Sequence, residues 1–190
     1  ADTKLGQPEY PDVQFHFTPI YRSHRGRKFE FGHGYSLFTS LLRPHSRGSV
    51  KIKKDGDSQK VLIDHNFLSD ARDEESIVEA IKKAREVLSS EEFDEVRGEE
   101  IAPGKSIQSD EELLAYIRKT AVTVYHPVGT CKMGTDDLSV VSPDDLKVKG
   151  MSNLRVIDAS VMPSIISGNT SAPTMMIAEM GARMILDEEK

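Results

Sequence analysis

The chain has 190 residues, and its 25 basic and 31 acidic residues give a formal net charge of −6. This length suits one domain with a proper core. The acidic balance argues against nucleic acid or an anionic membrane as the main partner. No apolar run is long enough to span a bilayer. Cys131 is the only cysteine, so no internal disulfide can form, and we expect a reducing, cytoplasmic compartment.

The N-terminal part is predicted to contain short strands after a leading loop over residues 1–8. The segment 13–20, "VQFHFTPI", alternates apolar and polar residues, the segment 35–44 is rich in strand formers, and 49–54 alternates again. Short linkers cannot make parallel crossovers. The pattern therefore predicts two or three antiparallel strands.

Helices are predicted in the middle and at the end of the chain. Apolar residues recur at helical spacing over 73–88, and a capping box at Ser109 and Glu112 predicts a second helix start. A buried strand is expected over 153–160, a loop over 162–173 and a final helix over 174–186. Pro173 suits the first turn of that helix, where its missing N–H costs nothing.

Motifs for nucleotides and metals fail on inspection. "GHGYSL" has Leu37 where a dinucleotide fingerprint needs its last glycine, and "GTCKMGTD" has Thr135 and Asp136 where a phosphate loop needs Lys and Ser or Thr. The six histidines show no metal-ligand spacing, and there is no CxxC. The chain is therefore expected to bind no metal and to carry no phosphate cradle of its own.

His126 stands in the segment "TVYHPVGTCKMG", residues 123–134. Pro127 restricts the histidine backbone to extended conformations, and Gly129 permits an unusual turn directly afterwards. A histidine aimed by its backbone, with a pKa near working pH, is suited to act as a general base. The residues alone favour a histidine at a strand end that is satisfied by a carbonyl.

The loop before the last helix is the second candidate site. In "ISGNTSAPT", small polar residues lead into the helix through Pro173, and the helix N-terminus would offer free N–H groups and a positive dipole end. Such an arrangement stabilises an anion. The alternative is an ordinary capped helix with Ser171 at or near the N-cap.

An ordered set of segments resembles a known family. "FHFTPI", "LLRPHSRGSVKIK", "IDHNFLSDARD", "RGEEIAPG", "YHPVGTCKMG", "SVVSPDDLKVKGMSNLRVIDASVMP" and "SGNTSAPTMMIAE" follow one another from about residue 9 to the end. Together they resemble the C-terminal part of the glucose–methanol–choline (GMC) family of FAD-dependent oxidoreductases. The choline dehydrogenase/oxidase and alcohol dehydrogenase branches are the most similar.

The resemblance implies an α+β fold, an antiparallel sheet of the substrate-binding domain flanked by helices. Residues 9–150 would form that domain, and residues 151–190 would supply a strand and helix that complete the flavin site. A separate N-terminal portion with the GxGxxG motif would hold FAD, so the chain is expected to be a fragment lacking it. The partner implied is a small-molecule alcohol.

The resemblance also implies roles for single residues. His126 would accept the hydroxyl proton of the alcohol while hydride passes to flavin N5, with Ser171 as its polar partner. The FAD-binding residues would be Asp158, Ala159, Ser171, Ala172 and Pro173. His16, which reads as a solvated strand histidine from its pattern alone, and Asn169 would lie in the substrate pocket.

One departure from the family keeps alternatives open. The family commonly has Asn or His at position 171, and the shorter Ser171 reaches less far toward the substrate oxygen. A hydroxynitrile-lyase-type reaction without net redox is therefore the alternative activity. A third possibility is that the isolated chain folds but is not catalytic.

Overall fold

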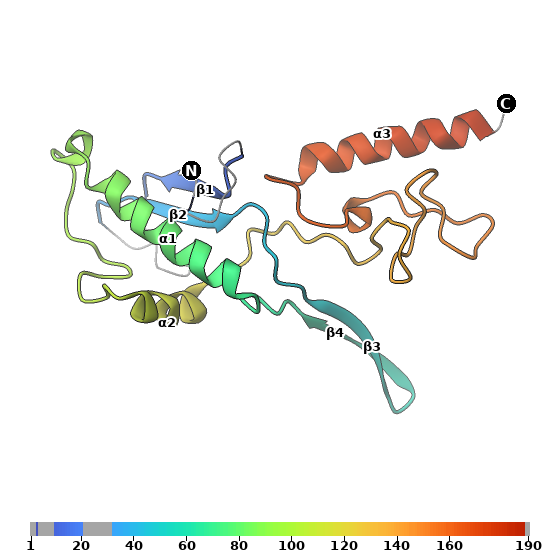
Figure 1. Cartoon of the computed structure of the whole chain (residues 1–190), viewed down its shortest axis with the longest axis horizontal. Helices are drawn as coiled ribbons and strands as arrows, with labels where there is room; N and C mark the ends of the chain where they lie inside the picture. The colour runs from blue at the N-terminus through green and yellow to red at the C-terminus, as the bar shows by residue number, and fades with distance from the viewer. Residues whose placement is uncertain (1–2, 4–9, 21–31, 189–190) are drawn as a thin grey trace. The chain divides into compact units, whose positions relative to one another are not determined.

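A computed structural model describes residues 3, 10–20 and 32–188, so the expected leading loop lies outside the described residues except for Thr3. The chain divides into two compact units. Unit 1 comprises Ala1–Arg47 and Asn66–Val124, and unit 2 comprises Gly48–His65 and Tyr125–Lys190. Figure 1 traces the elements of both units, which are described separately below.

Unit 1 combines a strand pair with helices. Strands β1 (Val13–Thr18) and β2 (Ser36–Leu41) pair antiparallel, with Val13 opposite Leu41 and Thr18 opposite Ser36. Helix α1 (Ala71–Leu88) packs against both strands, and α2 (Asp110–Thr120) packs against α1. A short 3₁₀ helix, η1 (Glu91–Phe93), lies in the connection between these helices.

The helix starts follow the signals in the sequence. Asp70 caps α1 by accepting a hydrogen bond from the Arg72 backbone N–H at 3.0 Å. At α2 the predicted capping box is present, because the Ser109 hydroxyl accepts from the Glu112 N–H at 3.3 Å and Glu112 Oε2 accepts from the Ser109 N–H at 3.0 Å. The helix expected over 73–88 is confirmed with its start at Ala71, and the helix start expected at Ser109 is confirmed.

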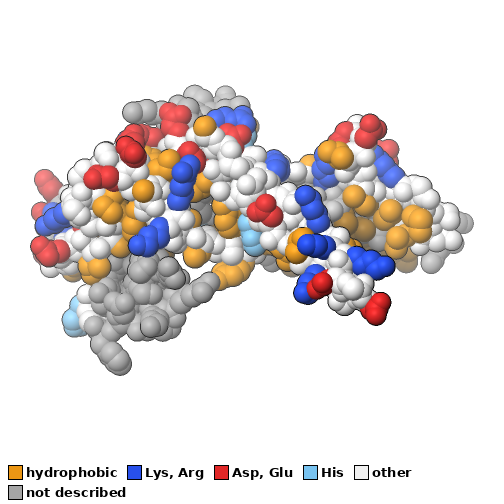
Figure 2. All heavy atoms as spheres, turned by 90° about the horizontal axis from the view of Figure 1, so that it is seen from below, with side chains coloured by type: hydrophobic (Ala, Val, Ile, Leu, Met, Phe, Trp, Pro, Cys, Tyr) orange, Lys and Arg blue, Asp and Glu red, His pale blue; other side chains and the backbone are white. Residues whose placement is uncertain are grey.

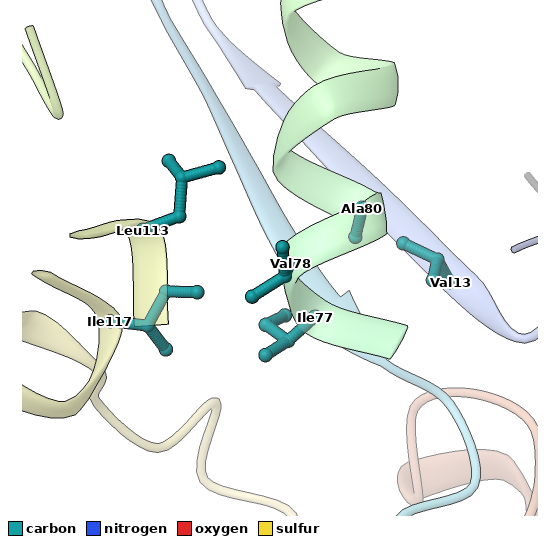
Figure 3. Close-up of a cluster of buried hydrophobic side chains, with 6 residues drawn as sticks. All are labelled: Val13, Ile77, Val78, Ala80, Leu113 and Ile117. Atoms are coloured by element: carbon teal, nitrogen blue, oxygen red, sulfur yellow. The ribbon is translucent and has the colours of Figure 1, made fainter. Parts of the chain in front are cut away.

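The core of unit 1 lies between these elements. Figure 3 shows its buried side chains, which come from β1, α1 and α2: Val13, Ile77, Val78, Ala80, Leu113 and Ile117. Leu113 is completely buried. The spacing of the α1 members places them on one helix face, as the periodicity predicted.

Unit 2 begins with a hairpin. Strand β3 (Ser49–Asp55) pairs antiparallel with β4 (Ser58–Asp64), and Gly56, with φ +61°, lies in the two-residue turn. The predicted strand at 49–54 is confirmed, whereas β4 was not predicted. At the base of the hairpin a Cβ on Gly48 would overlap the backbone oxygen of Asp64, so only glycine fits there.

The expected strand over 153–160 is wrong. Only Arg155 forms a bridge, an isolated one to Lys147, and Ala159–Val161 is a 3₁₀ helix, η2. The physical reason is local, since the Asp158 carboxylate accepts the Ser160 N–H at 2.7 Å and turns the backbone out of an extended path. The final helix, α3, runs over Ser171–Glu188 and begins three residues earlier than predicted.

A second hydrophobic cluster holds unit 2 together. Its buried members are Val141, Leu146, Val161, Met162 and Ile177. The fold as described combines helices with antiparallel strands, which confirms the α+β class. The described strands form two separate two-stranded pairs. The functional division expected at residue 150 stays a prediction.

Candidate functional site

The segment that carries His126 needs its glycines for space and for backbone angle. Gly129 has φ +90°, and a Cβ there would lie 3.3 Å from the Met162 carbonyl oxygen. Gly134 has φ +157°, and a Cβ there would lie 2.5 Å from the Ser139 hydroxyl. At both positions the positive φ disfavours any other residue, and an added Cβ would also meet a close neighbour.

Backbone hydrogen bonds attach this loop to η2. The Cys131 N–H donates to the Ser160 carbonyl at 3.0 Å, and the Met133 N–H donates to the Val161 carbonyl at 2.8 Å. Val128 and Met133 also pack against the cluster of unit 2. The backbone that follows His126 is thus held at several points along its length.

His126 itself is half-buried and lies between two left-handed backbone positions. Gly129 is one of them. Tyr125 is the other, with φ +63°, and its side chain is 82% exposed. The sequence carried no signal for Tyr125, because left-handed positions favour glycine and asparagine.

The end of the loop is fixed by a carboxylate. Asp136 accepts hydrogen bonds from the Ser139 hydroxyl at 2.8 Å and from Lys132 Nζ at 3.1 Å. These interactions, led by the Ser139 hydrogen bond, lower the pKa of Asp136 to about 2. The carboxylate is therefore ionised at neutral pH and closes the turn.

The predicted FAD-binding residues at 158 and 159 lie at the start of η2. Asp158 is exposed, and its carboxylate serves as the N-cap of this short helix. Ala159 packs against the cluster of unit 2. The position of Asp158 is thus fixed by the turn that it caps.

The N-terminus of α3 differs from those of α1 and α2. The other two helices carry acidic residues in their first turns, whereas α3 carries none. Ser171 is the first helical residue, not the cap. The Thr170 carbonyl accepts the Thr174 N–H at 3.0 Å and the Thr174 hydroxyl at 2.6 Å. Ser171 and Ala172 are exposed, so their N–H groups and the positive dipole end stay available to an anion.

The loop of His126, η2 and α3 share one hydrophobic cluster. Val128 lies two residues after His126 and packs against the cluster, and Ile177 lies six residues after Ser171 and is one of its buried members, as is Val161 of η2. The structure thus brings the three segments onto a common core. Among the described residues, no hydrogen bond joins His126 to Ser171 or to Asn169, which is exposed.

His16 lies in unit 1. It is opposite Phe38 in the β1–β2 pair, and its Nε2 lies 3.3 Å from the Ser40 hydroxyl. Its assignment to the substrate pocket stays a prediction. Across residues 3, 10–20 and 32–188, no three His, Cys, Asp or Glu side chains form a group suited to a metal ion. Within the same ranges, no helix is long and apolar enough to cross a membrane.

Comparison with known proteins places this geometry in a family. The family model described as GMC oxidoreductase matches residues 44–178 of the chain. The chain belongs to the GMC oxidoreductase family. The match covers the His126 loop, η2 and the first turns of α3, which are the segments that share the cluster of unit 2.

Two relatives of the GMC family extend the comparison over nearly the whole of this chain. An alcohol dehydrogenase [acceptor] of Pseudomonas putida is 46% identical over 176 residues, covering 93% of this chain and 32% of the relative. An oxygen-dependent choline dehydrogenase of Staphylococcus haemolyticus is 44% identical over 181 residues, covering 94% of this chain and 32% of the relative. The chain therefore spans about a third of the length of these relatives.

A solved structure shows the same fold. A formate oxidase of Aspergillus oryzae RIB40, studied for modification of its FAD, matches with a TM-score of 0.84 and 28% identity. The match covers 97% of this chain and 32% of the other. The GMC fold thus accounts for both units of the described chain.

Proposed function

We propose that this chain is the substrate-binding and C-terminal part of an FAD-dependent GMC enzyme that oxidises an alcohol to an aldehyde or ketone. One observation supports this most directly: the acid-free N-terminus of α3 shares a packed core with the loop of His126. A base and an anion-stabilising helix end are the two elements that such a reaction requires from the protein.

The residues around α3 fit FAD. The first turn of α3 offers the N–H groups of Ser171 and Ala172, this turn itself contains no acidic residue, and Pro173 adds no further donor. This end of the helix would stabilise negative charge on the N1–C2=O edge of the flavin. Asp158 and Ala159 would lie alongside the cofactor. When bound, FAD supplies the hydride acceptor.

His126 would accept the proton of the substrate hydroxyl at an imidazole nitrogen. Its backbone is restrained by Pro127, which limits the conformation of His126, and by the hydrogen bonds that attach Cys131 and Met133 to η2. Such restraint lowers the reorganisation needed when the proton moves. Ser171 and Asn169 would hold the substrate oxygen, and His16 would contact the rest of the substrate.

The rest of the FAD site would come from polypeptide that corresponds to the uncovered part of the relatives. The sequence is expected to lack a phosphate cradle, and the chain spans 32% of the length of the two relatives. We therefore expect the isolated 190-residue chain to bind FAD weakly and to be inactive. Titration with FAD tests this, and tight binding with a shifted flavin spectrum would contradict it.

Removal of the His126 imidazole tests the activity. In an exchange protein, this chain replaces the matching segment of the Pseudomonas putida relative. Reduction of the flavin by alcohols is then followed anaerobically in a stopped-flow instrument. We expect His126→Ala to slow reduction by about 10²–10⁴-fold, the usual contribution of a general base. His33→Ala, at an exposed histidine in unit 1, is the matched control. Unchanged reduction in His126→Ala would exclude the role of the base.

A lyase activity on the same fold is the second candidate. Ser171 favours it, because it replaces the longer polar residue common at this position and lies exposed at the first position of α3. Anaerobic mixing with a cyanohydrin separates the two activities. A lyase would release cyanide and leave the flavin oxidised, whereas an oxidoreductase reduces the flavin with an alcohol.

A further inference from the structure

The β1–β2 pair has one face on the core of unit 1 and one face directed away from it. Val13, Phe15 and Leu41 lie on the first face and pack with the cluster around Leu113. Side chains alternate along a strand, and directly opposed residues share a face. The second face, here called the outer face, is therefore formed by Gln14, His16 and Thr18 of β1 and by Ser36, Phe38 and Ser40 of β2.

The outer face is polar but uncharged. Three of its side chains carry hydroxyls, one carries an amide and one is an imidazole, while Phe38 supplies the remaining, hydrocarbon surface. All six side chains are partly exposed. By contrast, Lys, Arg, Asp and Glu side chains are spread widely over the view in Figure 2. Several neutral hydrogen-bonding groups around one ring suit a small, uncharged, polar ligand.

Ser40 holds the imidazole of His16 from the neighbouring strand. Because His16 lies directly opposite Phe38, both Ser36 and Ser40 are its diagonal neighbours. Of these two serines, only Ser40 makes a hydrogen bond with the ring, and its Oγ lies 3.3 Å from Nε2. Among the described residues, no second hydrogen bond holds the imidazole. The contact therefore occupies Nε2 and leaves Nδ1 as the ring nitrogen that can meet a ligand.

Occupation of one ring nitrogen decides what the other can do. A neutral imidazole carries its proton on either nitrogen, and the nitrogen without the proton is an acceptor. A hydrogen bond at one nitrogen selects the tautomer and restrains the ring orientation, so it also fixes whether the second nitrogen donates or accepts. Ser40 thus gives the His16 ring a defined binding edge.

We propose that Ser40 is a positioning residue, which holds His16 through Nε2 so that Nδ1 binds an uncharged hydrogen-bonding group on the part of the substrate that does not react. This inference rests on the proposed function, in which His16 contacts that part of the substrate. It adds a substrate class, alcohols that carry a second group that is polar but neutral. A quaternary ammonium group has no hydrogen-bond donor or acceptor, so Nδ1 would gain nothing from it.

Nitrogen NMR of the His16 ring tests the positioning without catalysis. The 190-residue chain is prepared with isotope-labelled histidine, and the resonances missing in His16→Asn assign this ring. We expect the Nδ1 and Nε2 shifts of His16 to move toward those of a free imidazole in Ser40→Ala. Ser40→Thr keeps a hydroxyl and should restore the original shifts. Ser36→Ala, which removes the other diagonal hydroxyl, is the matched control, and shifts unaffected by Ser40→Ala would overturn the proposal.

Saturation kinetics in the exchange protein test the role in substrate binding. The two substrates are n-butanol and the matching diol, which has a hydroxyl at each end of the same chain. For the diol we expect Ser40→Ala to raise the Kd about 3–10-fold, the usual contribution of one hydrogen bond. The limiting rate of flavin reduction should change less than about twofold, because the contact lies away from the reacting atoms. For n-butanol the Kd should also change less than about twofold.

A double-mutant cycle separates positioning from a direct contact of Ser40 with the substrate. His16→Ala should weaken diol binding at least as much as Ser40→Ala does, and Ser40→Ala should then have no further effect in the His16→Ala background. An effect of Ser40→Ala that persists without His16, or one that is equal for the two alcohols, would overturn the proposal.

This inference and the proposed function can fail separately. Flavin reduction that depends on His126, with diol binding that does not depend on Ser40, would contradict the inference alone. His16 shifts that depend on Ser40, in an exchange protein whose flavin no alcohol reduces, would support the positioning and contradict the proposed function.

Discussion

At the scale of single residues, Tyr125 is the least expected feature of the site. A bulky residue in the left-handed region costs about 1–2 kcal/mol, and Tyr125, at φ +63°, is 82% exposed, so burial of its own side chain does not offset that cost. Backbone strain of this kind clusters where a side chain must be aimed. The strained residue directly precedes His126. The direction in which the His126 side chain leaves the backbone is therefore set by the backbone conformation.

The strain predicts opposite effects of two substitutions at this position. Tyr125→Gly should raise the free energy of unfolding of the 190-residue chain by about 0.5–1 kcal/mol, because relief of strain exceeds the entropic cost of glycine. Tyr125→Val should lower it by about 1 kcal/mol, because a β-branched residue tolerates positive φ less. Urea denaturation measures both. Val124→Gly is the control and should lower the free energy of unfolding. A similar decrease in Tyr125→Gly would show that the backbone at Tyr125 is unstrained.

Asp136 predicts a pH-dependent effect. Its pKa is lowered to about 2 in the folded chain, below its ordinary value of 3.8, so its stabilising contribution is present above the ordinary value and is lost as pH falls through 2. Asp136→Asn should therefore lower the unfolding temperature at pH 7 and match the unchanged chain near pH 2. Thermal unfolding followed by circular dichroism from pH 7 to pH 2 measures this. A difference that stays constant over that range would contradict the assignment.

At the scale of elements, α3 is held by a close approach to the preceding segment. A Cβ on Gly181 would lie 2.6 Å from Cγ2 and 2.8 Å from Cδ1 of Ile157, and Gly181 is buried. Ile157 is stiff at its branched carbon, so it cannot yield easily. Because Gly181 has no side chain, helix α3 can approach the side chain of Ile157 this closely.

Replacement of Gly181 tests that contact. Gly181→Ala should lower the free energy of unfolding by about 1–3 kcal/mol, which exceeds the 0.5–1 kcal/mol that alanine gains in a helix. With Ile157→Ala as background the same change should cost much less, giving a coupling of about 1 kcal/mol or more in a double-mutant cycle. Gly98→Ala, with nothing within 4 Å of the new Cβ, is the control. Simple additivity of the two substitutions would argue against the contact.

The sequence predicted those elements whose local signals agree with their final environment. The capping box at Ser109 and the apolar spacing of α1 depend only on nearby residues, so both could be predicted. The segment 153–160 looked like a strand because Val156 and Ile157 are apolar, but these residues pack into the cluster of unit 2 without joining a ladder.

The candidate site was predictable in part for the same reason. His126 and the small residues before α3 were candidates from their types and spacing, but their roles follow only from the family resemblance and stay predictions. Ser171, expected at or near the N-cap, is the first residue of α3, whereas the left-handed Tyr125 has no local signal in the sequence. Strand β4 was missed because its run of Val61, Leu62 and Ile63 does not alternate.

At the scale of the whole molecule, each unit has a hydrophobic cluster of its own. The cluster around Leu113 belongs to unit 1, and the cluster around Val161 belongs to unit 2. Both residues are completely buried. We therefore expect the two clusters to contribute to stability separately.

Separate clusters predict separate responses to a core mutation. Leu113→Ala should destabilise unit 1 by about 2–5 kcal/mol, the usual cost of a cavity at a buried leucine. Amide hydrogen exchange should show faster exchange in α1 and α2, while protection of Cys131 and Met133, whose N–H groups bond to η2, stays unchanged. Equal loss of protection at both places would mean that the clusters unfold as one.

The base of the hairpin has a practical consequence. Gly48 closes directly against Asp64, and the Asn66 amide donates to the Arg47 carbonyl at 2.8 Å, so the chain leaves and returns at nearly one point. Because its two ends lie close together, the hairpin of residues 48–65 could be replaced by a short turn or by another hairpin without moving the residues on either side of it. This position is thus suited to the insertion of a peptide segment with a new binding specificity.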